Sequence, residues 1–234
     1  MIYIIQNFGR EFLYTDGYHI TGLAMTLWLL VISLVIGFCL ALPLAILRNA
    51  RNPLLWGPVW VYTFVIRGTP LYVQLLIVYT GFYSLDFVRD TPLLAAFFKQ
   101  GIDCTILAFG LNTGAYTTEI FAGAIRDTTF GEVDAGRSLG MSQFTLYRRI
   151  IIPSALRRAL PVYSNEVILM LHATTLAFTA TVPDLLKVAN DAYSATYNPF
   201  ASFSTVALIY LCVSFTLIFG FRKAEQRFLA FLKP

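Results

Sequence analysis

The sequence predicts an all-α membrane protein with five transmembrane helices, and three observations lead to this fold class. Hydrophobic residues make up 57% of the 234 residues, charged residues make up only 13%, and the mean hydropathy is +0.67. The apolar residues gather in runs that are long enough to cross a bilayer. The basic residues are sorted between alternate loops, as in other multi-pass membrane proteins. A chain of this composition has lipid as its solvent.

Five apolar runs are each long enough, at about 1.5 Å per residue in a helix, to cross roughly 30 Å of hydrocarbon. We expect one transmembrane domain, residues 1–234, with spans at about 22–47, 56–83, 105–125, 161–182 and 203–221. The loops on one side carry twelve Lys and Arg residues, and those on the other side carry four. Because positive loops stay in the cytoplasm, we expect the N-terminus outside and the C-terminus inside. Because the Lys and Arg residues are divided between loops in this way and are not gathered on one face, they do not indicate a nucleic-acid-binding surface.

The second expected span is interrupted by the sequence Arg67-Gly68-Thr69-Pro70. Pro70 cannot donate a backbone hydrogen bond and Gly68 loosens the helix, so this span is expected to be broken or bent. The freed backbone groups would be tolerated only against protein or water, which favours a segment that lines a pathway. The alternative is a structural kink, with Arg67 reaching toward the lipid headgroups.

The third and fourth expected spans both carry polar residues on one helical face. In the third, the polar stripe recurs every three or four residues and consists of Asn112, Tyr116, Glu119, Gly123 and Arg126. In the fourth, Glu166 shares a face with Asn165 and Met170, whereas His172 lies about 240° away around the helix. Neither polar face is suited to contact with lipid.

Ionisable residues at the middle of a bilayer cost about 2.5 to 3.5 kcal/mol each, so their default interpretation is functional. Within the spans we count the acids Glu119 and Glu166 against one cation, Arg67. The remaining negative charge would be satisfied by a cationic ligand. We therefore predict a substrate site built from Glu166, Glu119, Tyr116, Thr69, Asn165 and Met170. The alternative is that both acids are protonated or only hold helices together, and that selectivity lies elsewhere.

Residues 131–153 form a long polar, amphipathic segment between two apolar runs. A first helix is expected to end at Gly140, and Ser142 is the expected N-cap of a second short helix. The second helix would carry Phe144, Tyr147 and Ile151 on one apolar face. We expect this pair of helices, the knob, to dock a partner in the cytoplasm through Asp134, Ala135, Gly136, Gly140, Phe144 and Arg148.

The order of residues in the knob resembles the EAA loop of ABC importer permeases. The matching positions are Asp134, Ala135, Gly136, Gly140 and Ile152-Pro153. Residues 67–74, 112–126 and 163–178 are similar to polar amino acid uptake permeases, and within these to the membrane subunits for histidine and for lysine, arginine and ornithine. The chain has Asp134 in place of the usual Glu, Gly136 in place of Ala, and His172-Ala173 in place of a Lys followed by an acid.

The resemblance implies the type I ABC importer permease fold and a function as the transmembrane subunit of an ATP-driven importer in a bacterial inner membrane. The substrates would be polar, and here basic, amino acids. The chain would have no enzymatic activity or cofactor of its own, because ATP and Mg would be bound by two copies of a partner ATPase. Further expected partners are a paralogous permease subunit, in a heterodimer more than a homodimer, and a periplasmic substrate-binding protein.

Two other classes of protein fit the sequence less well. A secondary transporter or channel would not need ATP, but it would need internal inverted repeats or ion sites that the sequence lacks. A membrane enzyme would need a nucleophile and a base at a readable spacing, and none is seen. No Gly-Lys phosphate loop and no cluster of Cys and His occur, so the sequence offers no site for nucleotide hydrolysis or zinc.

Overall fold

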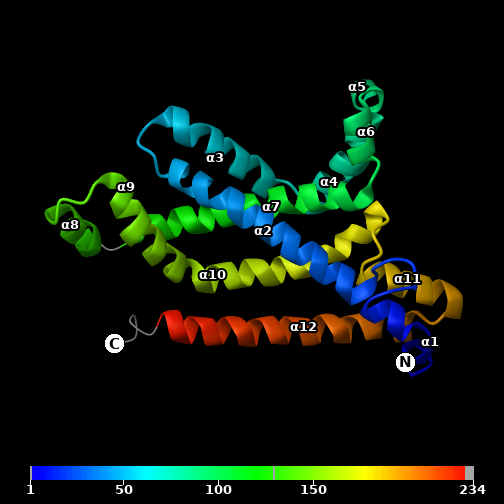
Figure 1. Ribbon diagram of the computed structural model, residues 1–234. Helices are drawn as coiled ribbons and strands as arrows, with labels where there is room; N and C mark the ends of the chain where they lie inside the picture. The colour runs from blue at the N-terminus through cyan, green and yellow to red at the C-terminus, as the bar shows by residue number, and fades with distance from the viewer. Residues whose placement is uncertain (1, 129, 230–234) are drawn as a thin grey trace.

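The computed structural model describes residues 2–128 and 130–229, and this part of the chain is built almost wholly of helices (Figure 1). The five long helices are α2 (Gly22–Arg48), α3 (Pro53–Gly68), α7 (Gly101–Arg126), α10 (Ile152–Ala173) and α12 (Pro199–Phe228). The short helices of the first half are α1 (Ile2–Leu13), α4 (Leu71–Leu76), η1 (Ile77–Gly81), η2 (Phe82–Ser84), α5 (Asp86–Asp90) and α6 (Pro92–Phe98). Those of the second half are α8 (Phe130–Ser138), α9 (Gln143–Leu146), η3 (Tyr147–Ile151), η4 (Thr174–Ala180) and α11 (Leu185–Thr196).

The length and composition of the described helices can be compared with the five expected spans. Helices α2 and α12 are each long and apolar enough to cross a membrane. Two bent pairs meet the same criterion only jointly, α3 with residues 71–84 and α6 with α7, so the count rises to four at most. The expected span 161–182 lies in α10 and η4, and α10, which carries Arg157, Arg158 and Glu166, is not among these helices.

The predicted break in the second span is confirmed. Helix α3 ends at Gly68, α4 begins at Leu71, and the axes of the two parts differ by 102°. Thr69 and Pro70 between them have extended backbone conformations. Because Pro70 cannot donate to the helical ladder and restricts the residue before it, the chain changes direction at this point. At the break, Arg67 lies against Tyr116 of α7, and the chain does not continue as one straight helix.

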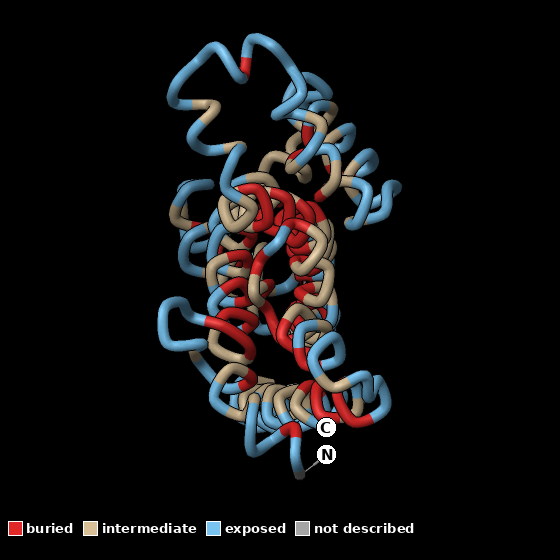
Figure 2. Tube along the Cα trace, turned by 90° about the vertical axis from the view of Figure 1, so that its right-hand side faces the viewer, coloured by how far each residue is buried: buried red, intermediate tan, exposed pale blue. Residues whose placement is uncertain are grey.

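Helices α2 and α7 share the most extensive contact between two of the described helices, and glycines at this contact allow a close approach. A Cβ atom on Gly37 would lie 2.4 Å from Cγ2 of Thr113, and one on Gly110 would lie 2.8 Å from Cγ2 of Ile36. Buried residues concentrate on the inner sides of the helices (Figure 2). Helix α2 is therefore a packed scaffold that fixes the position of α7.

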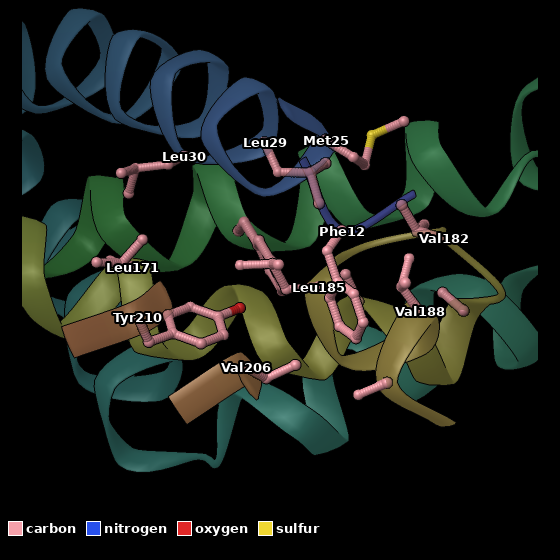
Figure 3. Packing of buried hydrophobic residues seen from close by; sticks show 14 of the residues in the cluster. Phe12, Met25, Leu29, Leu30, Leu171, Val182, Leu185, Val188, Val206 and Tyr210 are labelled. Atoms are coloured by element: carbon pink, nitrogen blue, oxygen red, sulfur yellow. The ribbon is translucent and has the colours of Figure 1, made fainter. Parts of the chain in front are cut away.

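A second packing centre joins the amphipathic α1 to the bundle. Phe12 of α1, Leu29 of α2, Leu185 of α11 and Tyr210 of α12 gather at this point (Figure 3), and all four side chains are buried. Gly22, with φ +57°, approaches the backbone oxygens of α1 so closely that a Cβ atom would lie 2.3 Å from them. The N-terminal segment is thus packed against the same end of the molecule as α11 and the start of α12.

The opposite end of the molecule carries the segments in which basic residues are frequent. The α2–α3 turn, the α8–α9 pair and the C-terminal end of α12 all lie there, whereas α1 and α11 lie at the other end (Figure 1). The arrangement of the helices thus agrees with the sorting of charge that was read from the loops.

Candidate functional site

Two adjoining hollows lie among α3, α4, α7 and α10, and they share Tyr116, Glu166 and Leu169. The smaller has a volume of about 200 Å³ and is completed by Leu71, Asn112, Met170 and Ala173. The larger has a volume of about 320 Å³ and is completed by Arg67, Glu119, Ile120, Val162 and Asn165. Five of the six predicted substrate residues therefore meet in one connected region. The polar faces predicted for the third and fourth spans thus face each other.

Glu166 is a buried acid that forms no ion pair in the part of the chain that the structure describes, although Arg67 borders the same hollow. Its exposed fraction is 6%, and it accepts a hydrogen bond of 3.1 Å from the hydroxyl of Thr113. Its carboxylate borders both hollows. A single hydroxyl leaves most of the hydrogen-bonding capacity of a carboxylate unused. Glu166 can therefore accept a cation or a proton from the hollow.

Glu119 is an acid of a different kind, because it already forms an ion pair. Nε of Arg48 and the hydroxyl of Thr63 each donate a hydrogen bond of 2.8 Å to its Oε1 atom. The charge balance read from the sequence omitted Arg48, which was assigned to the cytoplasmic loop after the first span. That balance was therefore wrong: Arg48, the last residue of α2, offsets one of the two acids.

Arg67 provides positive charge at the larger hollow. Its guanidinium lies 5.2 Å from the centre of the Tyr116 ring, which is within the range of a cation–π interaction. The hydroxyl of Tyr116 in turn lies 3.4 Å from the backbone oxygen of Arg67. The larger hollow thus presents one guanidinium and two carboxylates, one of which is already paired.

Thr69 borders neither hollow, unlike the other predicted substrate residues. It lies at the break between α3 and α4, where its hydroxyl donates a 2.9 Å hydrogen bond to the oxygen of Val65. The amide of Gln74 donates to the backbone oxygens of Ile66, at 2.6 Å, and of Thr69, at 3.0 Å, and accepts a 3.0 Å bond from Asn112. Gln74 therefore satisfies the carbonyls that the break sets free.

Gln74 was not among the predicted site residues, although a signal for it was present. It is a polar residue in an apolar run, four residues after Pro70. His172, in contrast, lies off the Glu166 face as predicted, since its Nε2 atom is 3.3 Å from the hydroxyl of Ser214 in α12. The helical periodicity of α10 thus separated the residues that face the hollow from those that face α12.

The knob has the predicted turn at Gly140 between two helices, but the second is not the separate short helix that was expected, because α9, η3 and α10 follow one another without a non-helical residue. Helix α8 ends at Ser138, Gly140 adopts φ +74°, and the Ser142 side chain accepts a hydrogen bond of 3.3 Å from the N–H of Thr145. Asp134 and Ala135 are exposed, and Asp134 lies 3.5 Å from Nη1 of Arg137. A surface that carries these two residues is open to a partner.

Two residues of the knob have environments that the sequence did not predict. A Cβ atom on Gly136 would lie 2.6 Å from Cδ1 of Leu146 and 2.8 Å from Cδ1 of Ile150, so this glycine faces inward. Its small size allows α8 to pack against α9 and η3. Gly136 is buried and therefore does not belong to the exposed docking surface in which it was predicted. The residues predicted to share the apolar face of the second helix also differ in exposure, since Ile151 is buried at 7% and Phe144 is exposed at 74%.

Phe144 lies beside an apolar groove on the outside of the knob. The groove has a volume of about 430 Å³ and is lined by Ile46, Gln143, Phe144, Tyr147, Arg148 and Ile152. Leu139, in the turn between the two helices, is 77% exposed. The predicted docking residues Phe144 and Arg148 therefore border one accessible surface, at the end of the molecule opposite α11.

Comparison with known proteins places this architecture in a family. The family model described as binding-protein-dependent transport system inner membrane component matches residues 33–229. The histidine/lysine/arginine/ornithine transport system permease protein HisM of Escherichia coli (strain K12) is 58% identical over 100% of this chain and 98% of its own length. The nopaline transport system permease protein NocM of Agrobacterium fabrum is 40% identical over 82% of this chain and 80% of its own length.

Solved structures have the same arrangement of helices. A chain of an amino acid ABC transporter, whose crystal structure was determined with histidines, matches with a TM-score of 0.77 and 32% identity, over 88% of this chain and 92% of that chain. A chain of the MetNI methionine ABC transporter in an inward-facing conformation shares the fold, with a TM-score of 0.69 and 16% identity, over 87% of this chain and 93% of that chain. The chain has the type I ABC importer permease fold and belongs to the family of binding-protein-dependent transport system inner membrane components.

Proposed function

We propose that this chain is a transmembrane subunit of an ATP-driven importer of basic amino acids, including histidine, lysine, arginine and ornithine. The observation that carries the proposal is the hollow of about 320 Å³ lined by Arg67, Glu119 and Glu166. A basic amino acid carries one carboxylate and two cationic groups. It could place the carboxylate near Arg67 and a cationic group on Glu166, the acid that has no cation of its own.

The names of the relatives support this substrate class. The 58% identical HisM is named for histidine, lysine, arginine and ornithine transport, and the 40% identical NocM is named for nopaline transport. The two acids of the hollow differ, because Glu119 forms an ion pair with Arg48 and Glu166 forms none. This difference offers a physical reason for selection by charge. An acidic amino acid would add negative charge beside Glu166, and an apolar one would bring its α-ammonium group but no cationic side chain.

The knob would couple the pathway to ATP hydrolysis in partner subunits. We propose that two copies of an ATPase, which bind ATP and Mg, contact Asp134, Ala135, Phe144 and Arg148 from the cytoplasm. A paralogous permease would complete the pathway, because the hollow is open on one side of this chain, and a periplasmic binding protein would deliver the substrate. The chain itself would then hold no cofactor.

From the charge sorting we propose that the N-terminus lies outside, the C-terminus inside and the knob in the cytoplasm. A cysteine introduced at Ser142 should react with an impermeant thiol reagent only from the cytoplasmic side, and one at Asp90 only from outside. Both residues are exposed, so access to the reagent is limited by the membrane alone. The reverse labelling pattern would contradict the proposed topology.

Reconstitution tests the proposed function. The chain, assembled with its permease and ATPase partners in proteoliposomes, should accumulate radiolabelled arginine only when ATP and the binding protein are supplied. Uptake that continues without ATP would favour a secondary transporter. Ala135→Trp should abolish ATP-driven uptake while the permease still inserts, because a bulky side chain would hold the two docking surfaces apart. Ala135→Ser is the matched control and should remain active.

A further inference from the structure

Glu119 is only partly satisfied by its ion pair. Both hydrogen bonds that it accepts, from Arg48 and from Thr63, end on its Oε1 atom. Within residues 2–128 and 130–229, no hydrogen bond or ion pair reaches its Oε2 atom, and the side chain borders the larger hollow. A carboxylate can accept about four hydrogen bonds. Glu119 therefore retains a free oxygen beside the hollow that contains Glu166.

The partner of Glu119 is held loosely for an arginine. Arg48 uses Nε alone, whereas an arginine that forms a strong pair with a carboxylate donates two parallel bonds. Its guanidinium also lies 5.8 Å from the centre of the Trp56 ring, toward the α2–α3 turn. The side chains of Arg48 and Glu119 are 20% and 17% exposed, so another ligand can reach the pair. A cation that enters the hollow could therefore compete with Arg48 for Glu119.

The two acids lie at different depths along α7. Glu166 is bonded to Thr113, and Glu119 follows Thr113 by six residues, which corresponds to about 9 Å along the helix. The displacement is directed toward α8 and the knob, which is the end of the molecule where α2 ends at Arg48 (Figure 1). A cationic group that moves along α7 toward the knob would leave Glu166 and meet Glu119.

We propose that Arg48 is a specificity-determining residue that competes with the cationic group of the substrate for Glu119. The inference rests on the proposed function and extends it from one acidic position to two. In the absence of substrate, Arg48 neutralises Glu119. When a basic amino acid moves toward the knob, its cationic group shares or takes over Glu119, and Arg48 limits how tightly it is held. Arg48 would thus allow release toward the cytoplasm.

A purely structural role for the same pair makes a different prediction. The bonds from Arg48 and Thr63 join α2 and α3 to α7 through Glu119, so their loss could simply loosen the bundle. Loosening would weaken all ligands to a similar degree. Competition, in contrast, concerns only ligands with a cationic side chain. Citrulline has the shape of arginine without its side-chain charge, so the two ligands together distinguish the roles.

The test is direct binding to the assembled importer in lipid nanodiscs, without the binding protein, measured with arginine and with citrulline. Arg48→Gln should tighten the binding of arginine about tenfold and leave citrulline unchanged, because Glu119 is released from its internal cation. Arg48→Lys, which retains the charge, should resemble the unmodified chain. Arg51→Gln is the matched control, since Arg51 lies three residues further along and borders neither hollow.

Equal changes for arginine and citrulline, or no change in arginine binding, would overturn the proposal. If Arg48→Gln does not assemble, the neutral pair Arg48→Gln with Glu119→Gln replaces it, and the preference for arginine over citrulline must then fall below that of the unmodified chain. An unchanged preference in that variant would also overturn the proposal. Failure of the proposed function is separate, because it would appear as absent ATP-driven arginine uptake by the unmodified importer.

Discussion

Glu119 and Glu166 are the same type of residue and border the same hollow, yet their surroundings differ. Glu119 is held by the cation of Arg48 and by Thr63, at 2.8 Å each, whereas Glu166 is more deeply buried and is held by Thr113 alone at 3.1 Å. Burial by itself thus does not identify a substrate-binding acid. What distinguishes the two is whether the protein supplies the opposite charge, and for Glu166 the substrate is the candidate that does so.

The largest expected effect separates the two acids directly. Glu166→Gln should lower arginine uptake in proteoliposomes by at least about tenfold, because the amide cannot balance a cationic group, and an unpaired charge in a low dielectric is costly. Glu119→Gln should lower it less, since Glu166 remains. Glu225→Gln, on α12 and outside both hollows, is the matched control. If Glu166→Gln and Glu119→Gln lower arginine uptake equally, the two acids do not differ in function.

Much of this comparison could be predicted from the sequence, because it depends on local patterns. Helical periodicity placed Tyr116 with Glu119, and Asn165 with Glu166, on faces that do meet. The Pro70 break and the Ser142 cap were predicted from the conformational preferences of single residues, and both are present. Such features involve only a few consecutive residues.

The pairing of Arg48 with Glu119 could not be predicted in this way. The two residues are 71 positions apart, and their contact depends on how α2 packs against α7 at Gly37. A sequence-based count assigns Arg48 to a loop because it follows an apolar run, although it is the last residue of α2 and its side chain reaches Glu119. The inward position of Gly136 was missed for the same reason, since its neighbour Leu146 belongs to another helix.

A second prediction concerns Gln74, which holds the break between α3 and α4 beside the hollow that both acids border. Gln74→Leu removes the amide that bonds the carbonyls of Ile66 and Thr69 at the break beside Arg67. Leaving the part-buried carbonyl of Ile66 and the buried amide of Asn112 without this partner should cost about 1 to 3 kcal/mol, measured as a lower midpoint of thermal unfolding of the assembled complex. Gln6→Leu, on the exposed face of α1, provides the control. An unchanged midpoint for Gln74→Leu would show that water or lipid satisfies the break.

A third carboxylate, that of Asp184, lies outside the expected spans. It is bonded by backbone N–H groups and not by side chains, which extends the comparison to another kind of acid. It accepts hydrogen bonds from the N–H groups of Lys187, at 2.9 Å, and Leu186, at 3.2 Å, and caps α11. Burial nevertheless raises the pKa of Asp184 from 3.8 to about 7. A raised folded-state pKa means that the folded protein binds the proton more tightly, so this group's contribution to stability falls as the pH rises from about 4 to about 7.

Asp184→Asn should remove that part of the pH dependence. Unfolding midpoints measured at pH 5 and pH 8 should differ less for the variant than for the unmodified protein, because an amide does not titrate. The same measurement on Asp191→Asn, an exposed residue of the same helix, controls for general effects of charge. An identical pH dependence in the unmodified protein and Asp184→Asn would mean that the backbone N–H groups fully offset the burial of Asp184.

The smallest expected effects come from the two hydroxyls that bond the acids. Thr113→Val removes the only hydrogen bond that Glu166 accepts within the described residues and should lower arginine uptake a few-fold. Thr63→Val removes one of two bonds to Glu119 and should change uptake less, because Arg48 remains. The two variants are isosteric and can be compared directly in one uptake assay. A larger loss for Thr63→Val would reverse the assignment of the two acids.

The central claim is that a basic amino acid crosses this subunit beside Glu166, and a structure of the assembled importer with bound arginine tests it most directly. The account predicts ligand density in the hollow among α3, α7 and α10, with the guanidinium of the ligand within hydrogen-bonding distance of Glu166 and its carboxylate facing Arg67. Arginine bound elsewhere in the membrane region, with partner side chains filling this hollow, would contradict the account.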